Sequence, residues 1–324
     1  MRALELQQLT GPDGFVLVDH PEPAGNGVVT IDVRAAGVSF PELLMSRDRY
    51  QYKPELPAVL GSELAGTVRS APPGGRLKRG DRVWATVDRG GFAEIAAAPP
   101  DRVFPLRDDM SFEQGAALGV NYLTAVFALQ RRAALRSDDT VLVLGAAGGL
   151  GTATIAVAKA LGARVLAVVS VAEKSETAAA AGADGVLVGG DWRDAVLART
   201  GGRGVDIVAD VVGGDATLQA VRSCAPEGRV LVLGFTAGEI PSIATNRLLL
   251  RNVSLVGAGF GALAASVDDL LVETASELSR LLDEGLRPVV GATLPLEQGA
   301  EAVRRLEARQ ALGKIVLTFD RPAS

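Results

Sequence analysis

One segment in the middle of the chain determines the fold: Val141-Leu142-Val143-Leu144-Gly145-Ala146-Ala147-Gly148-Gly149-Leu150-Gly151. Its first four residues form an apolar run, which is typical of a strand buried on both faces. The residues after it have the spacing of a G-x-G-x-x-G turn, with Ala146 in the place of the first glycine, and a helical pattern comes next. Gly148 lets backbone amides approach a pyrophosphate, and Gly151 lets the helix pack closely on the strand. We therefore predict a dinucleotide site at the N-terminus of this helix.

This segment has two other interpretations. Residues 141–158 carry no charge, and 18 such residues are about the minimum for crossing a bilayer. The cluster of glycines favours a strand, a turn and a helix over a membrane span, so we predict no membrane association. A purely structural turn would also use glycine, but the strands and helices that follow favour a cofactor site.

A regular alternation of apolar runs and helical patterns surrounds the glycine-rich turn. The predicted strands are residues 140–144, 164–169, 185–188, 205–209, 229–233 and 253–256. The helices predicted between the first five strands are residues 150–161, 172–181, 192–200 and 216–224. Strands and helices that alternate with short loops predict a doubly wound parallel sheet, hence an α/β fold.

The two ends of the chain have a different pattern. The first hundred residues are rich in proline, glycine and short strand candidates, which predicts an irregular β-domain. Residues 112–132 have helical spacing without proline. Near the C-terminus we predict helices at 270–284 and 297–309 and a final strand at 313–319. A C-terminal strand of this kind often rejoins the first domain, which would make the nucleotide domain an insertion.

The composition excludes several classes of chemistry. The chain has one histidine, His20, and one cysteine, Cys224, whereas a structural zinc site needs four such ligands. A serine or cysteine hydrolase would depend on His20, which lies in a proline-rich stretch. A disulfide cannot form within a chain that has one cysteine, which suits the reducing cytoplasm.

The charge pattern argues against nucleic acid as a partner. The formal net charge is −5 and there are no long basic runs. Met1-Arg2-Ala3-Leu4-Glu5 has an acid where a signal peptide needs an apolar stretch, so we expect a cytoplasmic protein.

The residue after the second predicted strand of the nucleotide domain identifies the cofactor. An NAD site usually has Asp or Glu here, about 20 residues after the turn, to bind the ribose hydroxyls. This chain has Ser170, which does not repel a 2′-phosphate, and Lys174 lies within reach of one. We predict NADPH. The alternative is that Lys174 is a solvated helix residue paired with neighbouring glutamates.

Several segments together resemble a known family. The chain is similar to the zinc-free quinone oxidoreductase branch of the medium-chain dehydrogenases/reductases. The segments that carry the resemblance are residues 33–39, 56–66, 80–83, 91–94, 121–125, 204–208 and 212–214. The resemblance implies a GroES-like catalytic domain, residues 1–118 and 260–324, and a Rossmann cofactor domain, residues 119–259. It also implies a homodimer, for which the edge strand at 253–256 could pair across a two-fold axis.

The resemblance also bears on the reaction. The zinc alcohol dehydrogenases of the superfamily have G-H-E where this chain has Gly61-Ser62-Glu63, and their cysteine ligand is replaced near Ser39. We therefore predict no metal site. Polarising a carbonyl without a Lewis acid is difficult. The zinc-free branch instead implies hydride transfer to a quinone or an α,β-unsaturated carbonyl, whose negative charge spreads onto a distant oxygen.

Residues at matching positions would bind the cofactor. The resemblance places Gly148, Gly149, Leu150 and Gly151 at the pyrophosphate, Ser170 and Lys174 at the 2′-phosphate, Trp192 at the adenosine phosphate and Arg309 on the cofactor side. It places the backbones of Phe235, Ala258 and Phe260 at the nicotinamide, with Thr124 packed near the same ring and Lys314 as a further candidate.

Two residues are candidates on the substrate side. Tyr50 aligns with a tyrosine that related enoyl reductases use as a proton donor, and its hydroxyl could protonate or stabilise an enolate. The alternative is that Tyr50 only lines the cleft. Ser39 stands where the family often has an asparagine that contacts nicotinamide or substrate.

Two other functions fit the same sequence. One is an enoyl-thioester reductase that acts on acyl carriers. The other, of a different class, is a non-enzymatic NADPH-binding sensor or interaction protein. Loss of turnover on every quinone and enone, with NADPH still bound tightly, would favour the latter.

Overall fold

The computed structural model describes residues 1–23 and 25–319, which form two compact units. Unit 1 comprises residues 1–120 together with the C-terminal segment that begins at Val290. Unit 2 is Asn121–Val289 and interrupts unit 1 in the sequence, as the strand pattern led us to expect. The second boundary between the units follows Val289, whereas we expected it after residue 259.

Packing explains where unit 2 ends. Helices α9 (Phe260–Ala264) and α10 (Leu270–Asp283) both contact α3 (Leu123–Val126), which belongs to unit 2. The Phe260 ring lies 5.4 Å from that of Phe127. The Tyr122 hydroxyl accepts a hydrogen bond of 3.1 Å from the Val289 amide. The apolar face of α10 is therefore buried within unit 2.

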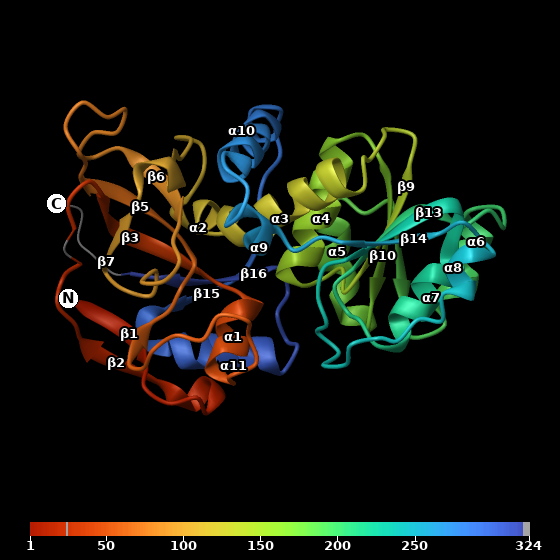
Figure 1. Ribbon diagram of the computed structural model, residues 1–324, viewed down its shortest axis with the longest axis horizontal. Coiled ribbons are helices and arrows are strands. Elements are labelled where there is room, and N and C mark those ends of the chain that lie inside the picture. The colour runs from red at the N-terminus through yellow and green to blue at the C-terminus, as the bar shows by residue number, and fades with distance from the viewer. Residues whose placement is uncertain (24, 320–324) are drawn as a thin grey trace. The chain divides into compact units, whose positions relative to one another are not determined.

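Unit 2 is built on a six-stranded sheet in which every strand pair is parallel, so the predicted fold class is confirmed (Figure 1). In spatial order its strands are β11 (Gly185–Val188), β10 (Arg164–Val169), β9 (Thr140–Leu144), β12 (Val205–Asp210), β13 (Cys224–Val232) and β14 (Ser254–Gly257). The chain order reverses direction at β9. Ligands of open parallel sheets bind at such a switch point, beyond the carboxyl ends of the strands.

Helices connect these strands. They are α4 (Gly149–Ala160), α5 (Ser175–Ala180), α6 (Trp192–Arg199), α7 (Asp215–Ser223) and α8 (Asn246–Leu249). Helix α4 contacts α5, and α6 contacts α7. The uncharged run at 141–158 is thus a buried strand followed by a helix. Among the described residues, no helix is long and apolar enough to span a membrane.

The predicted helix at 112–132 is helical but irregular. It begins as α2 (Phe112–Gly115), and π-helical turns at Leu118–Tyr122 and Phe127–Arg132 flank α3. The unit boundary falls inside this segment.

Unit 1 contains two sheets and three α-helices in its described part. A three-stranded sheet has the order β2 (Phe15–Asp19), β1 (Arg2–Leu6), β4 (Ala58–Val59). The larger sheet has the order β15 (Val290–Pro295), β16 (Lys314–Thr318), β3 (Val29–Val38), β5 (Glu63–Ser70), β6 (Arg82–Thr86), β8 (Val103–Pro105), and β7 (Ile95–Ala98) also pairs with β3. The helices are α1 (Phe40–Ser46), α2 and α11 (Gly299–Glu307).

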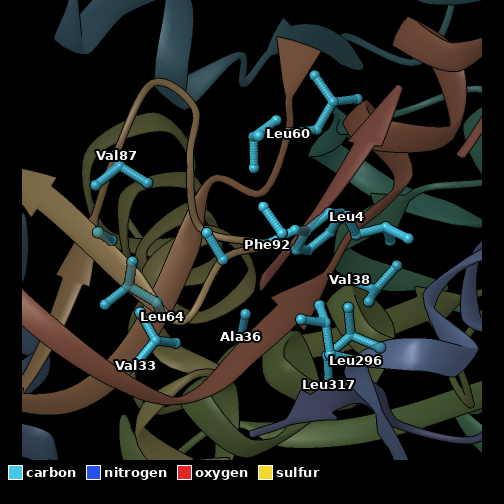
Figure 2. Packing of buried hydrophobic residues seen from close by; sticks show 14 of the residues in the cluster. Leu4, Val33, Ala36, Val38, Leu60, Leu64, Val87, Phe92, Leu296 and Leu317 are labelled. Carbon is cyan, nitrogen blue, oxygen red and sulfur yellow. The ribbon is translucent and has the colours of Figure 1, made fainter. Parts of the chain in front are cut away.

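The core of unit 1 joins both ends of the chain. Leu4 and Phe92 pack with Leu296 and Leu317 from the C-terminal segment, and Figure 2 shows these side chains in one apolar cluster. Strand β16 pairs antiparallel with β3, which sets Ile315 opposite Val38. The C-terminal strand therefore rejoins the first part of the chain, and it brings Lys314 beside the end of β3.

Candidate functional site

The glycine-rich turn has the geometry that the sequence motif requires. Gly145 leaves β9 with φ +64°, in the left-handed region that favours glycine. A Cβ on Gly151 would lie 2.3 Å from the Gly145 carbonyl oxygen and 2.8 Å from Ala146 Cα, so only glycine lets α4 approach the turn this closely. At Gly148 the nearest atom to such a Cβ would be 3.6 Å away. A side chain at residue 151 would therefore clash with the turn, whereas the space around Gly148 is free.

The N-terminus of α4 suits an anion. Gly148 is its N-cap residue and has no side chain to accept hydrogen bonds from the first-turn amides, and that turn carries no acidic residue. The amides of Gly149, Leu150 and Gly151 have no acceptor within an α-helix, and the helix dipole places positive charge there. These residues fit the pyrophosphate of a dinucleotide.

Ser170 and Lys174 lie at the same edge of the sheet as this turn. Strands β9 and β10 are parallel, with Val168 opposite Leu144, and the Ala146 amide donates a 3.1 Å hydrogen bond to the Val168 carbonyl. Ser170 follows β10 and is exposed, and Lys174 is half-buried in the short helical turn before α5. The two residues expected at the 2′-phosphate thus follow the strand that pairs with β9, the strand before the glycine-rich turn.

The residues expected at the nicotinamide follow the next strands at this edge. Phe235 follows β13, and its ring would lie 2.9 Å from a Cβ on Gly213. Ala258 follows β14, and its amide donates to the Val232 carbonyl at 3.2 Å. Phe260 is buried, with its ring directed onto Phe127. Thr124, on α3, is half-buried.

Trp192 and Arg309 lie in other surroundings. Trp192 begins α6 and packs in the apolar core of unit 2 with Leu187 and Val196, so its indole has a packing role there. Arg309 belongs to unit 1, where it follows α11 with φ +56° and is exposed.

Unit 1 contains a buried polar cluster around the two expected positions Ser39 and Lys314. It consists of Ser39, Glu42, Ser62, Glu63 and Lys314, which come from the end of β3, α1, the start of β5 and the start of β16. Glu42 and Glu63 are 0% and 1% exposed, and Lys314 is 2% exposed. Charged groups this deeply buried must be paired or neutralised.

Glu63 provides the carboxylate of the cluster's ion pair. Its carboxylate is paired with the Lys314 ammonium, which also donates to the Ser39 hydroxyl. It accepts further hydrogen bonds from Ser39 Oγ at 2.9 Å and from the Val120 amide at 2.8 Å. A Cβ on Gly37 would lie 2.7 Å from Glu63 Oε1, so glycine makes room for the pair. The Ser39 hydroxyl, expected to face the substrate, is instead held inside this network.

Glu42 is the second carboxyl group of the cluster. Its side chain accepts hydrogen bonds from Ser62 Oγ at 2.6 Å and from the Ser39 amide at 3.0 Å. Burial is the main cause that raises the pKa of Glu42, and the hydrogen bond from Ser62 opposes it. Tyr50 is half-buried, and burial together with the charge of Glu42 raises the pKa of its phenol.

A local sequence pattern could have predicted the position of Glu42 but not that of Glu63. Ser39-Phe40-Pro41-Glu42 has the spacing of a helix capping box, which could have identified Glu42 as an inward-facing residue. The Glu63–Lys314 pair joins residues 251 positions apart, beyond the range of any local pattern.

The histidine and the cysteine of the chain lie apart from this cluster. Among the described residues, no group of three or more His, Cys, Asp or Glu side chains could hold a metal ion. Cys224 is buried, and burial raises the pKa of its thiol to about 12. His20 is partly exposed, with Nδ1 2.9 Å from the Pro21 carbonyl oxygen.

Comparisons with known proteins agree on one family. Residues 25–108 match the model of the alcohol dehydrogenase GroES-like domain, and residues 149–277 match that of the zinc-binding dehydrogenases. The chain is 35% identical to mouse (Mus musculus) quinone oxidoreductase-like protein 2 over 304 residues, which cover 92% of this chain and 87% of the relative.

Solved structures extend the likeness to nearly the whole chain. A probable oxidoreductase from Mycobacterium abscessus superposes with a TM-score of 0.90 at 44% identity and 98% coverage of both chains. The quinone oxidoreductase of Thermus thermophilus, which was also solved in complex with NADPH, superposes with a TM-score of 0.83 at 34% identity, covering 98% of this chain and all of that one.

Proposed function

This chain belongs to the quinone oxidoreductase family of the medium-chain dehydrogenases/reductases, and on that premise we propose that it is an NADPH-dependent oxidoreductase whose hydride acceptor is a quinone or an α,β-unsaturated carbonyl compound. One observation carries the proposal: the N-terminus of α4 has no side-chain cap and lies at the switch point of a parallel sheet. There is free space around Gly148, and the lack of a side chain at Gly151 lets α4 pack closely on the turn. The amides of Gly149, Leu150 and Gly151 would hold the pyrophosphate of NADPH there, and the cofactor would supply the hydride for the reaction.

The preference for NADPH over NADH rests on the end of β10. An acidic side chain at this position would repel a 2′-phosphate, and the chain has the Ser170 hydroxyl instead. Lys174 adds a positive charge four residues on. These two residues would bind the 2′-phosphate, while the amides of the α4 N-terminus bind the pyrophosphate. Comparing the KM values for NADPH and NADH tests this assignment, and a clear preference for NADH would overturn it.

We propose that the reaction does not use zinc. Ser39 and Ser62 offer hydroxyl groups where Zn²⁺ would require imidazole or thiolate ligands. The Glu63 carboxylate is already engaged by Lys314. This set of donors does not fit the metal. An acceptor that delocalises the incoming negative charge over a conjugated system does not need such a metal.

Tyr50 is the substrate-side residue of this proposal. Its partly exposed phenol could donate a hydrogen bond to the anionic oxygen of the reduced substrate. If Tyr50 acts as a proton donor, Tyr50→Phe lowers turnover on enones. If it only lines the site, the substitution changes KM alone.

We also propose a cytoplasmic homodimer. Strand β14 is an edge strand of the unit 2 sheet, and the nearby apolar side chains of Leu249 and Leu250 are 74% and 78% exposed. Exposed apolar groups beside the edge of a sheet are typical of a self-association surface. Sedimentation equilibrium tests the dimer, with Leu250→Lys as the variant that should dissociate it.

The proposal is tested by a screen of NADPH oxidation over quinones, small enones and enoyl-CoA esters. Oxidation that depends on a quinone or enone supports it. Activity confined to enoyl-CoA would identify an enoyl-thioester reductase. Tight NADPH binding without oxidation by any acceptor would favour the non-enzymatic sensor.

A further inference from the structure

Glu42 is a buried carboxyl group that the proposed reaction leaves without a role. Its side chain is fully buried on α1, and its two oxygens accept hydrogen bonds from Ser62 Oγ and the Ser39 amide. Both of these donors are neutral. The cluster's ammonium group, on Lys314, is paired with Glu63 instead. The cluster therefore contains two carboxyl groups and one cation.

This imbalance favours a proton on Glu42. Burial raises its pKa, and the charge of Glu63 on β5 raises it further. The hydrogen bond from Ser62 and the charge of Lys314 on β16 act in the opposite direction. Tyr50, after α1, is a further titratable group, and an ionised Glu42 raises the pKa of its phenol. A carboxyl group whose charged form is disfavoured by burial keeps its proton to higher pH than usual and can then donate it.

Ser62 connects this carboxyl group to the outside of unit 1. Glu42 is 0% exposed, whereas Ser62 is partly exposed. Its Oγ lies 2.6 Å from Glu42 Oε1, a distance at which either oxygen can be the donor once the carboxyl group is protonated. The Ser62–Glu42 pair therefore runs from the interior of unit 1 to a partly exposed hydroxyl. Tyr50, the proposed substrate-side residue, lies close enough for an ionised Glu42 to raise the pKa of its phenol.

We propose that Glu42 and Ser62 form a proton relay, in which Glu42 stores a proton and Ser62 delivers it to the anion that hydride addition leaves on the substrate. This inference rests on the proposed function. The Ser62 O–H bond breaks as its proton bonds to the anionic oxygen or the α-carbon of the substrate. The Glu42 O–H bond breaks as its proton moves to Ser62 Oγ. Glu42 is left as a carboxylate near Lys314 and the Ser39 amide, and a proton from solvent restores it through Ser62.

The relay differs from donation by Tyr50. The phenol of Tyr50 is a weaker acid than usual, because burial raises its pKa. Loss of a proton from Glu42 to the relay would further oppose ionisation of Tyr50. In this scheme Tyr50 orients the substrate oxygen with a hydrogen bond, and the proton comes from Glu42.

The first measurement reads the carboxyl group without any turnover. The infrared spectrum of the protein without cofactor should contain the carbonyl stretch of a protonated carboxylic acid at neutral pH, and Glu42→Gln should remove it. Glu113→Gln, at a partly exposed acid on α2, is the matched control and should leave it in place. In Ser62→Ala the band should persist to higher pH, because the hydrogen bond that lowers the pKa of Glu42 is gone.

The second measurement follows turnover on a small enone, with NADPH binding checked by fluorescence. Glu42→Gln and Ser62→Ala should each lower kcat by about 10²-fold, the usual contribution of a general acid, with the KM for NADPH within twofold of wild type. Wild-type kcat should fall as pH rises through the Glu42 pKa, and Glu42→Gln should have a flat profile. Ser46→Ala removes a buried hydroxyl of α1 that donates only to the Leu43 carbonyl, and it should behave as wild type.

The outcomes separate the two proposals. If wild type oxidises NADPH with enones, and Glu42→Gln keeps the wild-type kcat and pH profile, the relay is refuted and the proposed function stands. A missing carboxylic-acid band in wild type also refutes the relay alone. If wild type oxidises NADPH with no acceptor, the proposed function is refuted and the relay with it. Slow turnover with a flat pH profile in both variants, with NADPH bound normally, supports the relay.

Discussion

Removing the ammonium group of Lys314 tests whether the buried Glu63 carboxylate depends on this counter-ion. Lys314→Met keeps the length of the side chain but leaves the Glu63 carboxylate, 1% exposed, without its counter-ion. Breaking a buried pair from one side usually costs about 3–5 kcal/mol of the free energy of unfolding. Glu63 would keep hydrogen bonds from Ser39 Oγ at 2.9 Å and the Val120 amide at 2.8 Å, which places the expected cost near the lower value, about 3 kcal/mol.

The two tryptophans allow the loss to be measured in the right unit. Trp84 is buried in unit 1, where it stacks on Phe104, and Trp192 is buried in unit 2. In a Trp192→Phe background, fluorescence therefore reports the unfolding of unit 1 alone. For a domain of this size, about 3 kcal/mol corresponds to a fall in Tm of roughly 6–12 °C.

Two further variants make this prediction specific. Adding Glu63→Gln to Lys314→Met removes the orphaned charge, so the double variant should recover most of the lost stability. Lys53→Met breaks the ion pair between Lys53 and Asp48, in which the two side chains are 64% and 46% exposed. This substitution should lower the free energy of unfolding by less than about 1 kcal/mol. If Lys314→Met is as stable as Lys53→Met, or if the double variant is no better than the single one, the reasoning about Glu63 is wrong.

Three other predictions concern the remaining site residues. Gly151→Ala should weaken NADPH binding at least tenfold in a fluorescence titration, because its Cβ would lie 2.3 Å from a backbone oxygen, whereas Gly190→Ala, with no atom within 4 Å, should bind normally. Lys174→Ala should raise the KM for NADPH about tenfold and leave that for NADH unchanged, since one charged contact contributes about 1.5 kcal/mol or more; equal effects on both would remove Lys174 from the 2′-phosphate site. The raised pKa of Glu42 means that this residue's contribution to stability falls as pH rises from the unfolded value, about 4.3, through the folded pKa, because the unfolded chain loses its proton first. In urea midpoints measured across the same range, Glu42→Gln should therefore lose less stability with rising pH than wild type, and identical pH dependence in the two proteins would contradict a protonated Glu42.

Local sequence patterns predicted unit 2 well. Apolar runs predicted β9, β10 and β11 with the bounds that the structure has, because strands covered on both faces contain little else. The glycine-rich turn was predictable because a short motif meets its own steric requirements, as the contacts at Gly151 show.

Long-range packing limited the rest. The amphipathic pattern of α10 showed that one face is buried but not what covers it, so the expected division at residue 259 lies before α9 and α10. Trp192 matched a family position, yet its neighbours Leu187 and Val196 place it in the core. Ser39 was expected at the substrate, but its hydroxyl is held by Lys314, 275 residues away in the sequence.

Transfer of hydride from NADPH tests the central claim most directly. The protein should be mixed with NADPH deuterated at C4 and an enone or quinone, and the reduced product examined by mass spectrometry. Deuterium in the product of an enone, or acceptor-dependent oxidation of NADPH by a quinone, is the predicted result. Tight binding of NADPH without oxidation by any quinone, enone or enoyl-CoA ester would contradict it.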